Sequence, residues 1–137
     1  MGNGVIPYSC PIEVTLDVIG GKWKGIILTF LLEKPRRFNE IKRELPSITQ
    51  RILTLQLREL EADGIVNREI FREIPPKVEY SLTEFGKTLE PILFSMHVWG
   101  DHYSNQVVQR KSNRQAPPAC EFRHLVKNPP TTLSTPP

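Results

Sequence analysis

The most constraining feature of the sequence is a helical pattern followed directly by two β-type runs. The helical pattern lies in ITQRILTLQLRELEADGIV, Ile48–Val66, where leucines recur at the spacing of one helix face. The β-type runs are residues 65–71 and 77–82. The segment REIPP lies between them, and its two prolines require a turn. The sequence therefore predicts a helix that leads into a hairpin with a rigid tip.

The helix in this stretch is expected to cover about residues 50–63. Thr49 can cap its first turn, and Asp63-Gly64 can end it. The wheel, drawn at 100° per residue, gathers three side chains on the predicted core side: Leu53, Leu57 and Leu60.

Further helical segments precede it. Patterns at Pro11–Ile19 and about 22–33 predict two helices, and Arg37-Phe38 should be extended. Asn39 can cap a short helix, NEIKREL, that is joined to the next helix by Pro46-Ser47-Ile48. Two helices joined by a tight turn and followed by a hairpin make a winged helix-turn-helix. The predicted fold class is thus mainly α with a small β-hairpin (α+β).

A long helical pattern follows the hairpin. Thr83 should cap it, and Pro91 should kink or divide it. Near its end the regular spacing of apolar residues disappears, and six of the chain's 13 prolines fall in Pro117–Pro137. We expect an N-terminal arm at 1–9, one domain at 10–105, and a Pro-rich, disordered basic tail at 106–137.

Charge is unevenly distributed. The net charge is +3, yet residues 1–103 hold 13 basic and 14 acidic side chains, whereas residues 104–137 hold 5 and 1. An argument for nucleic-acid binding must therefore rest on local placement of charge. The segment MGNGVIPYSC lacks the features of a secretory signal, and the longest apolar run, Ile26–Leu32, is too short to span a bilayer. We expect a cytoplasmic protein with no membrane partner.

Four ordered sequence blocks, followed by Trp99-Gly100, carry a resemblance to a known family: Cys10–Lys24, Arg37–Leu45, Ile48–Glu69 and Pro75–Gly86. Together they resemble the HxlR-type family of bacterial winged helix-turn-helix transcriptional regulators, relatives of the MarR type. The resemblance implies a homodimer, formed by the terminal helices, that binds a pseudo-palindromic DNA operator and represses or activates transcription. Ser47 stands where glycine is expected in the turn, and it can bond locally to the backbone.

In such a fold the helix at about 50–63 would enter the major groove with its early turns nearest the bases. Gln suits adenine, Arg suits guanine, and Thr or Leu can meet the thymine methyl. Acidic side chains occur only in the later turns. The alternative is an ordinary solvated helix face. The candidate base-contacting residues are Gln50, Arg51, Thr54, Leu55 and Arg58.

Basic residues around this helix are candidates for phosphate contacts. Those beside the preceding helix are Arg37, Lys42 and Arg43, with Lys22 and Lys24 farther upstream. The wing at 65–82 would touch the DNA backbone or the minor groove. The residues that bracket its tip are Arg72 and Lys77.

The C-terminal helix carries more aromatic surface than a domain of this size needs internally. Packing against its symmetry mate and the first helix would bury that surface. The alternative is that the stripe closes the core of a monomer. The candidate dimer-interface residues are Phe94, Met96, Trp99 and Tyr103.

Cys10 precedes Pro11 at a predicted helix start, where the positive end of the helix dipole favours a reactive thiolate. Glu13 could accept a hydrogen bond from the Cys10 backbone N–H, and its charge would oppose thiolate formation. Some members of the resembled family sense electrophiles or oxidants through a cysteine in this block. The alternative is a small, semi-buried residue. Cys120, in the tail, could resolve an intermolecular disulfide.

No residue pattern indicates an enzyme, a metal site or a cofactor. His97 and His102 diverge by about 140° on a helix, so they form no metal pair. Three hypotheses follow. The first is a DNA-binding, nucleoid-associated transcriptional regulator that acts as a homodimer. The second is a redox- or electrophile-sensing regulator that uses Cys10, and the third is a winged-helix protein–protein interaction module without DNA binding. The sequence indicates no particular small-molecule effector.

Overall fold

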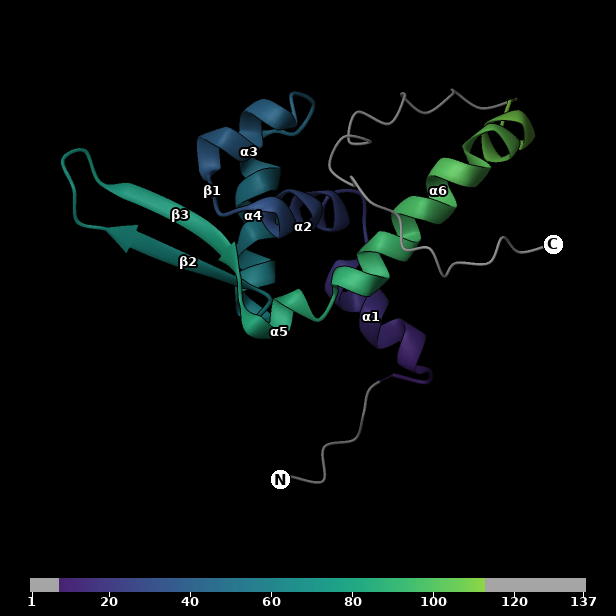
Figure 1. Ribbon diagram of the computed structural model, residues 1–137, viewed down its shortest axis with the longest axis horizontal. Helices are drawn as coiled ribbons and strands as arrows, with labels where there is room; N and C mark the ends of the chain where they lie inside the picture. Colours follow the sequence, from purple (N-terminus) through teal and green to yellow (C-terminus); the bar gives the residue numbers. More distant parts are fainter. Residues whose placement is uncertain (1–7, 113–137) are drawn as a thin grey trace. The chain divides into compact units, whose positions relative to one another are not determined.

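The computed structural model describes residues 8–112. They form two compact units that divide between Lys87 and Thr88, and each unit is described by itself. The first holds five helices and three strands within its described part (Figure 1): α1 Pro11–Ile19, α2 Lys24–Glu33, β1 Arg36–Arg37, α3 Phe38–Glu44, α4 Gln50–Ala62, β2 Val66–Phe71, β3 Lys77–Leu82 and α5 Glu84–Lys87. The predicted winged helix-turn-helix is confirmed.

A small antiparallel sheet forms the wing, with strand order β1-β3-β2. In Figure 1 the β2–β3 hairpin extends away from α2 and α4. The extended segment predicted at Arg37-Phe38 lies one residue earlier and is a true third strand, in which Arg36 pairs with Tyr80. Arg36 is buried, and its guanidinium lies 2.7 Å from the Glu33 carboxylate. The hairpin is thus anchored to the helices by β1.

The ends of α4 follow the predicted capping. The Thr49 hydroxyl accepts a hydrogen bond from the Ile52 N–H at 3.1 Å. At the other end Gly64 has φ 76°, a left-handed conformation that favours glycine. This turn lets the Ile65 N–H reach the Leu60 carbonyl at 3.0 Å, as in a Schellman motif. Helix α4 therefore has fixed limits at both ends.

The core of the first unit lies where α2, α3 and α4 meet the base of the hairpin. The α4 residues predicted to face inward, Leu53, Leu57 and Leu60, are at most 1% exposed. Ile41 and Leu45 are also buried, as expected. The apolar segment of α2 contributes Ile27, Leu28, Phe30 and Leu31. This packing sets which side of α4 remains available to solvent.

Two helix starts differ from expectation. Residues 21–23 form a turn, so α2 begins at Lys24. The cap of α3 is Arg37, not Asn39, because the Glu40 carboxylate accepts the Arg37 N–H at 3.2 Å. The helix therefore begins two residues earlier than the asparagine suggested.

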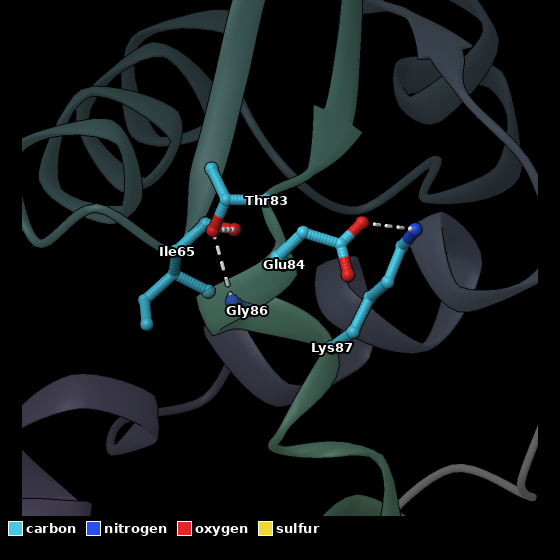
Figure 2. A network of polar contacts seen from close by, with 5 residues as sticks. All are labelled: Ile65, Thr83, Glu84, Gly86 and Lys87. Carbon is cyan, nitrogen blue, oxygen red and sulfur yellow. Dashed lines mark hydrogen bonds and ion pairs between the residues drawn. The ribbon is translucent and has the colours of Figure 1, made fainter.

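Thr83 ties the end of the wing to the beginning of β2. Its hydroxyl donates to the Gly64 carbonyl at 2.6 Å and accepts from the Gly86 N–H at 2.9 Å. Figure 2 shows Thr83 between Ile65 and Gly86, with the Glu84–Lys87 ion pair on the neighbouring turn. The predicted cap is confirmed, and α5 is held at the C-terminal end of α4.

The second unit contains α6, Glu90–Arg110. The single helix expected after Thr83 is two helices, and Pro91 lies in the first turn of α6, where its missing N–H is not needed. The helix runs past the predicted domain end at 105. Residues 1–7 and 113–137 of the predicted arm and tail lie outside the described residues. None of the helices in 8–112 is long and apolar enough to cross a membrane.

Candidate nucleic-acid interface

The exposed side of α4 carries two stripes of predicted contact residues. Arg51 and Leu55, one turn apart, are exposed, and Leu55 is 51% accessible. The second stripe, Gln50, Thr54 and Arg58, lines a hollow beside the wing. The Thr54 hydroxyl donates to the Gln50 carbonyl at 2.8 Å, which leaves its methyl group as the contact surface.

The hollow beside the second stripe is open and has a volume of about 390 Å³. We call it the α4–wing hollow. Phe38 and Tyr80 supply aromatic walls, and Arg58 faces it together with Arg68 of β2. The acidic residue among those that line this hollow is Glu61. The sequence singled out neither Arg68 nor Tyr80, because only the strand register places them opposite each other at the base of the hairpin.

A second hollow of about 440 Å³ lies between α3 and the wing. It brings together three of the predicted phosphate contacts, Arg37, Arg43 and Lys77. Arg72, predicted with Lys77 to bracket the wing tip, is exposed beyond β2 and lies outside both hollows. Basic side chains from two elements far apart in sequence thus converge on one surface.

The cations of this second hollow are held to different degrees. Lys77 Nζ lies 3.2 Å from the Glu79 carboxylate and 5.0 Å from the centre of the Phe71 ring. Within the part of the chain that the structure describes, Arg43 makes one long hydrogen bond, 3.5 Å from its Nε to the Asn39 carbonyl. Arg43 is therefore the more adaptable of the two toward an incoming anion.

Lys24 does not belong to the surface predicted for it. It is 9% exposed, and its Nζ lies 2.6 Å from the Glu59 carboxylate. A buried, paired ammonium is not available to a phosphate group. Glu59, one of the acidic residues in the later turns of α4, joins α4 to the start of α2.

Cys10 is exposed at the N-cap of α1, with an extended backbone and no side-chain capping bond. The Glu13 carboxylate accepts bonds from the Ser9 hydroxyl at 2.7 Å and the Ser9 N–H at 2.9 Å. These bonds, with a smaller contribution from the Cys10 N–H, lower the pKa of Glu13. The Glu13 carboxylate, predicted to accept a hydrogen bond from the Cys10 N–H, thus bonds mainly to Ser9. Cys120 lies outside the described residues.

In the second unit, Met96 and Trp99 of α6 are 51% and 56% exposed. Phe94 and Tyr103 are half-buried, and the Trp99 and Tyr103 rings lie 5.2 Å apart between centres. In the described part of the chain, no three His, Cys, Asp or Glu side chains are grouped so as to hold a metal ion.

Comparison with known families identifies the fold. Residues 18–108 match the family described as HxlR-like helix-turn-helix. The chain belongs to this family. The match covers α2 to most of α6 and confirms the resemblance drawn from the four sequence blocks. Members of the HxlR-like family are helix-turn-helix transcriptional regulators and not enzymes, and the same holds for this chain.

Individual relatives support the same family assignment. The chain is 62% identical over 104 residues to an uncharacterised HTH-type transcriptional regulator, YybR, of Bacillus subtilis (strain 168), with 76% of this chain and 83% of YybR covered. It is similar to the solved structure of the redox regulator HypR in its reduced form, with a TM-score of 0.70 and 62% identity over 72% of this chain and 97% of HypR. The reduced transcriptional regulator YodB from B. subtilis gives a TM-score of 0.62 and 38% identity over 70% and 95%.

Proposed function

We propose that this HxlR-family regulator binds duplex DNA, with α4 in the major groove and the wing on the backbone or minor groove. The observation that carries the proposal is the exposed Arg51–Leu55 stripe of α4. Basic side chains also line two hollows, one beside the other stripe of α4 and one between α3 and the wing. Recognition helices present their N-terminal turns to base edges. The first turn of α4 holds no acidic residue, so nothing there repels phosphate.

A homodimer on a pseudo-palindromic operator is the second part of the proposal. The support is the exposed apolar surface of α6, where Met96 and Trp99 stay accessible in a single chain. On α1, Ile12 and Leu16 lie one turn apart and are 67% and 57% exposed. Apolar surfaces of this kind on terminal helices favour burial against a second copy. Such a regulator would act in the cytoplasm, on the nucleoid.

DNA binding is tested with an operator selected from a random duplex pool. Affinity should fall steeply as salt rises, because each phosphate contact releases condensed counterions. Sedimentation should give two chains per selected duplex. Absence of salt-dependent binding to duplex DNA, or failure to select any sequence, would favour the protein–protein interaction module instead.

Redox control is a second candidate function. Two observations favour it: Cys10 is exposed at a helix N-terminus, and one solved relative is named as a redox regulator. Oxidation of a thiolate there would alter the start of α1. Control through this thiol would make the regulator a sensor of electrophiles or oxidants.

Diamide treatment tests the redox function. Wild-type protein should change its operator affinity after diamide, whereas the Cys10→Ser variant should keep the affinity of the untreated protein. The two proteins are compared by anisotropy, with reversal by dithiothreitol as the control. Equal responses of wild type and variant would exclude Cys10 as the sensor.

A further inference from the structure

Arg68 of β2 and Arg58 of α4 line the same hollow, although they come from different elements. Both side chains are exposed. Within residues 8–112 neither guanidinium has a carboxylate within ion-pair distance. Two unpaired guanidinium groups thus face one open space of about 390 Å³.

The position of Arg68 is fixed by the sheet. In the sheet, Arg68 pairs with Tyr80 of β3, and Tyr80 pairs on its other side with Arg36 of β1. Arg68 therefore lies in the three-stranded base of the wing, not in the two-stranded tip. A side chain on a backbone held by strand pairing loses less conformational freedom on binding than one on a backbone without such pairing.

The balance of charge in the α4–wing hollow favours an anion. Two arginines line it against the single carboxylate of Glu61. Guanidinium forks match the oxygens of a phosphate group and bind them in bidentate fashion. The Gln50–Thr54–Arg58 stripe leads from the first turn of α4 into the same hollow. With α4 in the major groove, a DNA strand that borders the groove would therefore lie next to this hollow.

We infer that Arg58 and Arg68 together grip one segment of the DNA phosphate backbone, so that Arg68, at the base of the wing, is an additional DNA-binding residue. The inference rests on the proposed DNA-binding function and deepens it. Because phosphates carry no sequence information, these two arginines contribute affinity and register, whereas the Arg51–Leu55 stripe reads the bases.

The test replaces Arg68 by glutamine and measures binding to a selected operator and to unrelated duplex DNA over a range of salt concentrations. Arg68→Gln should weaken both by a similar factor, roughly tenfold at low salt. The slope of log affinity against log salt should fall by about 2 for a dimer, one contact per subunit. Arg68→Lys, which keeps the charge, should restore most of the slope.

Lys87→Gln is the matched control. It removes the same charge from exposed α5, which Thr83 holds at the far end of α4, so the slope should stay at the wild-type value. Thermal melting verifies that each variant is folded. Arg58→Gln combined with Arg68→Gln should lose less than the product of the single losses, since both groups hold the same segment.

Distinct results separate the two levels of the proposal. If Arg68→Gln behaves like Lys87→Gln while Arg51→Ala still loses operator affinity, the Arg68 inference is overturned and DNA binding stands. If Arg68→Gln weakens only the selected operator, Arg68 reads bases and the phosphate assignment is wrong. If wild type shows no salt-dependent binding, the proposed function fails and the inference fails with it.

Discussion

Arg51→Ala is expected to weaken binding to a selected operator by roughly 10- to 100-fold, about 1–3 kcal/mol. Arg51 lies in the first turn of α4 and is exposed. It stands outside the α4–wing hollow, on the stripe that it shares with Leu55. From this position a guanidinium can meet a guanine edge, and alanine would remove both bonds of a bidentate contact.

The decisive readout is the ratio of operator affinity to non-specific affinity, measured by anisotropy at fixed salt. Arg51→Ala should lower this ratio, whereas Arg68→Gln should leave it nearly constant. Because Arg51 is exposed, the unfolding midpoint should change little. Unchanged operator affinity in a folded Arg51→Ala variant would contradict the assignment of α4 as the recognition helix.

Gly86→Ala is expected to destabilise the protein by about 1–3 kcal/mol. A Cβ at this position would lie 2.1 Å from the Ile65 carbonyl oxygen and 3.3 Å from a methyl carbon of the same residue. The closer atom belongs to the main chain at the start of the wing, so it cannot rotate away. Relief would pull Gly86 from Thr83, whose hydroxyl accepts the Gly86 N–H.

Urea unfolding, followed by circular dichroism, measures this effect. Lys87→Ala is the neighbouring control, since it alters an exposed residue of the same short helix. It should change stability by no more than about 0.5 kcal/mol. If Gly86→Ala unfolds at the same urea concentration as Lys87→Ala, the close approach of α5 to Ile65 does not exist in solution.

Local rules were sufficient for α4. Leucine spacing predicted its buried face, Thr49 its beginning and Gly64 its end, because each signal acts within one or two helical turns. The same spacing placed Arg51 and Leu55 on the solvent side. For the base-reading candidates, exposure could therefore be predicted from the sequence alone.

Contacts between distant segments could not be predicted in this way. The pairing of β1 with β3 depends on a two-residue strand, too short to show an alternating pattern. Lys24 is charged, as surface residues usually are, yet it is buried and paired with Glu59 on another helix. Arg68 reaches the α4–wing hollow only through the register of the sheet. In each case the deciding partner lies far along the chain.

The division of α4 into two stripes has an evolutionary consequence. Arg51 and Leu55 project to solvent and line neither hollow, so substitutions there leave the core and the wing contacts in place. If Arg51 and Leu55 read the bases as proposed, duplicated genes can acquire new target sequences by changing a few exposed side chains, while the same scaffold continues to hold the duplex. Diversification of regulatory networks would require no redesign of the fold.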